Sequence, residues 1–187
     1  SPDAGDPKAY GNPAVLRPYL KDKLARAQRL ARSAYNGLAF SAEELPLDRP
    51  RIAFRDMVRS TDSRTMICCL LPPGMAAMEK APVLVQRRGG AAEAAALLGV
   101  MSSVPFDWYM RRWVEMKMSF ELLSPSPVPT VDISSRLGSR LVDTAGRLAA
   151  IDGRYTDWAS EAGVPVGSVI NQEHKDDLIA ELDALVS

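Results

Sequence analysis

The stretch from Arg49 to Thr65 combines the side-chain types that most often contact DNA. It reads RPRIAFRDMVRSTDSRT and interleaves five arginines with serine and threonine. A guanidinium group offers a fixed fork of donors that can pair with a guanine edge or a phosphate. Hydroxyl groups donate to phosphate oxygens or to bases. The pattern therefore predicts a DNA-contacting loop, built from Arg55, Arg59, Ser60, Thr61, Ser63 and Arg64.

A solvated loop with internal ion pairs explains the same stretch equally simply. Arg55 precedes Asp56, and Arg59 lies three residues before Asp62. If these pairs form, the loop is structural. Ion pairs buried throughout residues 49–64 would then favour a protein-docking module over a DNA-reading one.

Lys80, Arg111 and Arg112 are further candidate DNA contacts. The two arginines belong to a helix expected to begin near Ser102 or Ser103 and to continue through Met116. Its aromatic residues Trp108, Tyr109 and Trp113 could stack on unpaired bases, but their helical spacing favours packing in the core. Arg111 and Arg112 lie off that face, where they could reach a phosphate or simply be solvated.

The sequence predicts neither a catalytic residue nor a metal ligand set. His174 is the only histidine, and no candidate nucleophile lies near it in the sequence. Asp107 and Glu115-x-Lys117 resemble the acidic-acidic-lysine pattern of metal-dependent nucleases, but they are expected on one helix rather than on paired strands. Glycine-rich phosphate loops are absent.

Composition is ordinary for a cytoplasmic globular protein, with 47% hydrophobic and 25% charged residues in 187. No apolar run is long enough to span a membrane, and we expect no membrane partner. Cys68 and Cys69 are adjacent, which favours reduced thiols.

The net charge is zero, yet the charges are unevenly distributed along the chain. Residues 1–128 hold 18 Lys/Arg and 13 Asp/Glu, whereas residues 129–187 hold 5 Lys/Arg and 10 Asp/Glu. This asymmetry suits a nucleic-acid-facing part followed by a protein-facing part, although solvated surfaces explain it as well.

Three segments should position these residues in an α/β (α+β) fold. Residues 1–36 form an arm and a basic helix, from about Ala14 to Tyr35, that ends near Gly37. Residues 37–130 form a small mixed sheet with packed helices: strands at 51–55, 66–71 and 81–86, a buried helix at 91–101, the aromatic helix, a return to the sheet at 120–123, and a Pro-rich connector at 124–130.

Residues 131–187 are predicted to be helical and to dock the preceding domain. An apolar stripe from Ile133 to Leu148 is interrupted at Gly153, a short helix follows around 156–162, and a last helix begins near Gln172. The chain ends inside the apolar stripe of that last helix without a cap, so we expect a longer parent protein.

These segments, in this order, resemble the specificity region of large adenine-specific DNA methyltransferases of type II restriction-modification and phage-defence systems in bacteria. The resemblance rests on RIAFRDMVRSTDSRTMICCLL followed by Pro72-Pro73-Gly74, on Lys80-Ala81-Pro82, on LLGVMSSVPFDWYMRRW, on FELLSPSPVP, and on the closing LIAELDALV. It covers about residues 40–187. Type I specificity subunits share the same order of elements.

The resemblance implies a target recognition domain that binds double-stranded DNA and is attached to an N-terminal methyltransferase domain. The Asn/Asp-Pro-Pro-Tyr/Phe motif that takes the flipped adenine is absent from this chain, as is the S-adenosylmethionine loop. We therefore expect no cofactor and no methyltransferase activity here, and S-adenosylmethionine in the missing domain. A docking module without base reading is the alternative.

Overall fold

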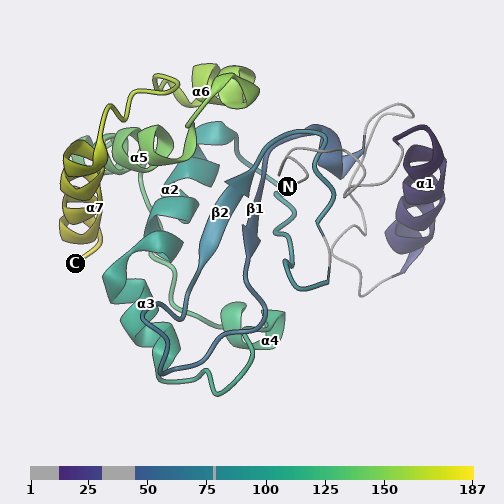
Figure 1. Cartoon of the computed structure of the whole chain (residues 1–187), viewed down its shortest axis with the longest axis horizontal. Coiled ribbons are helices and arrows are strands. Elements are labelled where there is room, and N and C mark those ends of the chain that lie inside the picture. Colours follow the sequence, from purple (N-terminus) through teal and green to yellow (C-terminus); the bar gives the residue numbers. More distant parts are fainter. Residues whose placement is uncertain (1–12, 31–44, 78) are drawn as a thin grey trace, which may run out of the picture.

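A computed structural model describes residues 13–30, 45–77 and 79–187, and it shows an α+β fold (Figure 1). Strands β1 (Arg51–Phe54) and β2 (Cys68–Leu71) pair antiparallel, with Arg51 opposite Leu71 and Phe54 opposite Cys68. Within the described residues, no helix is both long and apolar enough to cross a membrane. The predicted class and the first two predicted strands are confirmed.

The segment predicted as a strand at 81–86 follows the other edge of β1 without becoming a regular strand. The Phe54 amide donates to the Pro82 carbonyl at 3.0 Å, and the Leu84 amide donates to the Ile52 carbonyl at 2.8 Å. One isolated bridge joins Ala53 and Val83. Because Pro82 has no N–H to donate, the ladder is interrupted there, and the strand prediction is wrong for this physical reason.

Residues 120–123 do not return to the sheet, because they form the short helix α4 (Phe120–Leu123). The chain instead meets the sheet region just before α4. Met57 and Lys117 form an isolated bridge, and the Met118 amide donates to the Asp56 carbonyl at 2.8 Å. Phe120 then lies edge-on against Phe54, with ring centroids 5.3 Å apart. The Pro-rich connector that follows, residues 124–130, is neither helix nor strand, as predicted, and is mostly exposed.

Helix α2 (Ala91–Ser102) is the centre of the molecule and lies between the sheet and the C-terminal helices (Figure 1). Its alanines and leucines are buried on nearly all sides, which confirms the prediction of a buried helix. Gly99 permits the close approach of its neighbour α5 (Arg136–Ala149), because a Cβ there would lie 2.9 Å from that of Ala145.

The C-terminal helices pack on α2 through one continuous hydrophobic core that extends from Phe54 to Leu182. Helix α6 (Thr156–Ala162) coincides with the predicted bounds, and helix α7 (Gln172–Val186) begins where predicted. Polar contacts join the layers: the Tyr155 hydroxyl donates to the Leu70 carbonyl at 2.8 Å, and Glu161 accepts from the Ala91 amide at 3.0 Å.

Helix α1 (Pro13–Arg29) contains the described part of the predicted basic helix. Arg17 makes a two-pronged contact with Asp48, at 2.8 and 2.9 Å, and this contact lowers the pKa of the Asp48 carboxyl. Asp48 belongs to the 3-10 turn η2 (Pro46–Asp48), just before β1. Leu30 follows the helix in a bend, and the rest of the predicted helix, with the predicted end at Gly37, lies outside the described residues.

Candidate nucleic-acid interface

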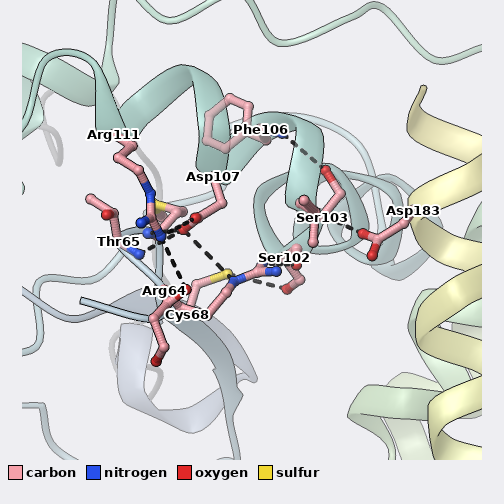
Figure 2. A network of polar contacts seen from close by, with 12 residues as sticks. Arg64, Thr65, Cys68, Ser102, Ser103, Phe106, Asp107, Arg111 and Asp183 are labelled. Atoms are coloured by element: carbon pink, nitrogen blue, oxygen red, sulfur yellow. Dashed lines mark hydrogen bonds and ion pairs between the residues drawn. The ribbon is translucent and has the colours of Figure 1, made fainter. Parts of the chain in front are cut away.

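The candidate interface is built on helix α3 (Val104–Arg111), which begins where the sequence predicted a cap. The Ser103 hydroxyl accepts from the Phe106 amide at 3.3 Å, and Pro105 occupies the first turn. Asp183, on the C-terminal helix α7, accepts from the Val104 amide at 2.7 Å (Figure 2). The start of α3 is therefore held by both its own cap and the C-terminal helix.

The buried carboxylate of Asp107 fastens the predicted DNA-contacting loop to α3. Only 4% of Asp107 is exposed, and its Oδ1 accepts from the amides of Thr65 at 2.7 Å and Met66 at 2.6 Å (Figure 2). Buried amides left without a partner would cost free energy, so these bonds fix the end of the loop in place.

Arg111, predicted to contact DNA, completes this network from the other end of α3. Its guanidinium donates to Asp107 Oδ2 at 3.1 Å and also to the carbonyls of Ser60 at 3.2 Å and Ser63 at 3.0 Å. One side chain thus bridges α3 and the middle of the loop. These hydrogen bonds hold the loop against α3. The Arg111 side chain is 33% exposed.

Arg64 is engaged in the same way. Its guanidinium donates to the carbonyl of Ser102, and its Nε lies 3.7 Å from Asp107 Oδ1. The charges of Arg64 and Arg111 are therefore shared with one buried carboxylate. The structural interpretation of the sequence expected ion pairs of Arg55 with Asp56 and of Arg59 with Asp62, whereas Arg64 pairs with an aspartate more than 40 residues away.

The turn at the tip of the loop forms without using the guanidinium of Arg59. Asp62 Oδ2 accepts from the Arg59 amide at 3.0 Å, and the Thr65 hydroxyl donates to the Arg59 carbonyl at 3.1 Å. The Arg59–Asp62 ion pair of the structural alternative is thus replaced by a contact with the backbone. The side chains of Arg59, Thr61 and Ser63 are exposed, and that of Ser60 is half-buried.

Arg55 is exposed as well, and Asp56 beside it turns to other partners. Asp56 is 4% exposed and lies 3.7 Å from the Lys80 ammonium and 3.5 Å from that of Lys117. Within the described part of the chain, the guanidinium groups of Arg55 and Arg59 make no hydrogen bond or ion pair. The structure thus brings two exposed arginines and the exposed Lys80 to the loop.

Arg112 lies outside the Asp107 network and stacks on an exposed aromatic ring. Its guanidinium carbon is 4.8 Å from the centroid of Trp108. Trp108 is 60% exposed and Trp113 is 59% exposed, and Trp113 leans against Tyr109 at 6.3 Å. The expectation that these tryptophans pack in the core is therefore wrong.

The prediction placed the wrong face of α3 in the core. Phe106, Met110 and Val114, spaced four residues apart, are the buried positions, and Asp107 is buried beside them. The helix also ends at Arg111, so Met116 is not part of it and is 60% exposed. The apolar stripe through Phe106 and Met110 is equally visible in the sequence, and it predicts the buried face correctly.

Among the described residues, no group of three or more histidine, cysteine, aspartate or glutamate side chains could hold a metal ion. Burial raises the pKa of the Cys68 thiol to about 11, so it stays protonated at neutral pH, and both cysteines are free. Glu115 and Lys117 follow α3 rather than lying on it, and Lys117 pairs with Asp56. His174 lies 3.1 Å from the Arg147 guanidinium.

Comparisons of this chain with family models, with curated proteins and with solved structures gave no match.

Proposed function

We propose that this chain is a sequence-specific DNA recognition module of an adenine-specific DNA methyltransferase or restriction-modification enzyme. The module is non-catalytic, and catalysis with S-adenosylmethionine belongs to an N-terminal domain outside this chain. The observation that carries the proposal is a loop fixed by a buried carboxylate, with the guanidinium groups of Arg55 and Arg59 exposed and without internal partners among the described residues.

A fixed loop suits base reading because it binds without first being ordered. Asp107 holds its backbone at the C-terminal end, and Arg111 holds it in the middle. Ordering a flexible loop on binding would otherwise subtract from affinity. The exposed hydroxyls of Thr61 and Ser63 lie on the same loop and can donate to phosphate oxygens while the arginines reach base edges.

Charge separation supports a division of labour between DNA and protein contacts. The residues up to 128 carry a net positive charge, and those from 129 onwards carry a net negative charge. On α7, Glu181 pairs with Arg140 of α5, and the acidic surface there would repel phosphates. DNA would therefore approach the end of the molecule that carries the loop and α3, opposite α6 in Figure 1.

A protein-docking module is the second candidate, and one observation favours it. A groove of about 440 Å³ is lined mainly by apolar side chains, among them Ile52, Val83, Leu97 and Phe120. A hydrophobic groove can receive the apolar face of a helix from another protein or domain. On this alternative, Arg64 and Arg111 fix the loop, and no base is read.

The test is selection from a random duplex pool by the 187-residue chain, at about 50 mM salt so that weak electrostatic binders are retained. We expect a recovered sequence motif. Replacing Arg55 or Arg59 with alanine should relax one position of that motif and weaken binding about fivefold to 150-fold, the value of one bidentate arginine–guanine pair.

Arg136→Ala is the matched control, since Arg136 is equally exposed but lies on α5. It should leave the motif unchanged. Uniform weakening by Arg55→Ala and Arg59→Ala, with a shallower salt dependence, would mean that they contact phosphates only. Retention of no duplex would leave docking as the better account.

A further inference from the structure

We infer that Trp108, Trp113 and Arg112, at the C-terminal end of α3, form a stacking site for an unpaired base of duplex DNA. The inference deepens the proposed function and rests on it. It starts from an exposure that the fold does not require: two tryptophans are each about three-fifths exposed, although burial of an aromatic ring is strongly favourable.

The two rings are held in place, as a stacking platform requires. Trp108 and Arg112 are one helical turn apart and stack on each other, and Trp113 leans on the half-buried Tyr109. The helical path continues past Arg111, because the Trp113 amide donates to the Met110 carbonyl at 3.0 Å. Since Trp108 remains 60% exposed beside Arg112, a face or edge of the indole is still open to a ligand.

The charge around these rings favours a nucleic acid over an apolar protein surface. Arg112 is exposed and lies over Trp108, whereas Asp107 is buried and already occupied. Glu115 is the exposed acidic residue of this segment. An apolar protein partner would have to desolvate the Arg112 guanidinium, while a phosphate next to a stacked base would pair with it.

The site is also contiguous with the proposed duplex-reading loop. Arg111 is on α3 immediately before Arg112, and it contacts the carbonyls of Ser60 and Ser63 in the loop. A base displaced from a duplex held by that loop would therefore emerge close to the tryptophans. Enzymes that modify a base must take it out of the stack, and base–aromatic stacking offsets part of that cost.

The experiment compares two DNA probes by fluorescence anisotropy with the whole chain: a 20-base-pair duplex that contains the motif recovered by the selection, and the same duplex with one extra unpaired adenine next to that motif. We expect the second to bind more tightly by about fivefold to 150-fold, the factor that corresponds to stacking of one base. Trp108→Ala with Trp113→Ala should abolish this preference and leave binding of the paired duplex. The phenylalanine double variant should retain most of the preference.

Tryptophan emission provides a second readout. The chain has three tryptophans, and the third, Trp158, is buried in α6. The probe with the unpaired adenine should quench emission of the parent protein but not of the double phenylalanine variant, which still binds it. Leu137→Ala, which shortens a 65% exposed apolar side chain on α5, is the matched control and should preserve both the preference and the quenching.

The outcomes separate the stacking site from the proposed function. Equal affinity of the parent for both probes, or a preference that survives the double alanine variant, overturns the stacking site while sequence-dependent binding of the paired duplex still stands. If neither probe binds, both proposals fail, and the tryptophans are better explained as a protein-docking face.

Discussion

Removal of the Asp107 carboxylate is the sharpest test of how the loop is held. Asp107→Ala deletes the acceptor for two buried amides and leaves the cations of Arg64 and Arg111 without their carboxylate. A hydrogen bond to a charged group is worth about 1.5–3 kcal/mol, and breaking a buried ion pair costs about 3–5 kcal/mol. Because both arginines are one-third exposed, water compensates part of this loss. We expect a decrease of about 3–5 kcal/mol in the free energy of unfolding.

Asp107→Asn separates the two contributions. The asparagine carbonyl has two lone pairs and can still accept from the Thr65 and Met66 amides, but the amide nitrogen faces the Arg111 guanidinium that Oδ2 had accepted from. Only the ionic part is then lost, and we expect about 2 kcal/mol.

Urea unfolding of the two variants, with Asp177→Asn as control, measures these values. Asp177 is exposed on α7, so its substitution should change the unfolding free energy by less than about 0.5 kcal/mol. The m value should stay constant if stability alone changes. A loss below about 1 kcal/mol for Asp107→Ala, or equal losses for both variants, would refute the account of the loop as fastened by this carboxylate.

Two further predictions concern the layers behind the loop. Tyr155→Phe removes the hydroxyl that donates to the buried Leu70 carbonyl and should lower the unfolding free energy by about 1 kcal/mol in urea titration, and an unchanged midpoint would contradict that contact. Because the pKa of Cys68 is raised from 9.0 to about 11, its contribution to stability is complete below pH 9 and is lost as pH rises towards 11. The urea midpoint should therefore fall between pH 8.5 and 10.5 more steeply in the parent than in Cys68→Ala.

The helices were predictable from the sequence where one signal dominates locally. Gln172 and Thr156 begin helices at the predicted positions, where apolar residues recur at helical spacing. At Gln172 the Asn171 side chain also caps the helix. The strand at 51–54 follows from alternation between turn residues. The strand prediction for residues 81–86 is wrong because Pro82 removes a donor from the hydrogen-bond ladder. The valine-rich composition of that segment does not reveal this.

The sequence predicts which segment forms the candidate site, but it does not predict which arginines are exposed and which hold the loop. Arg55, Arg59, Arg64 and Arg111 look alike in the sequence, yet two of them are exposed without partners in the described structure and two hold the loop. The difference is decided by Asp107, which is far from the loop in the sequence. No local pattern says that this aspartate points inward, because its burial depends on the amides it satisfies.

Asp107 also explains why the exposed tryptophans and the loop belong together. The carboxylate turns inward because the Thr65 and Met66 amides require an acceptor, so the stripe of α3 that carries Phe106, Asp107 and Met110 faces the core. With that stripe inward, the geometry of the helix turns Trp108 outward. The buried contacts of Asp107 thus fix the loop and leave the Trp108 ring exposed. A substitution that removes the Asp107 carboxylate should therefore weaken both duplex binding and the preference for an unpaired base.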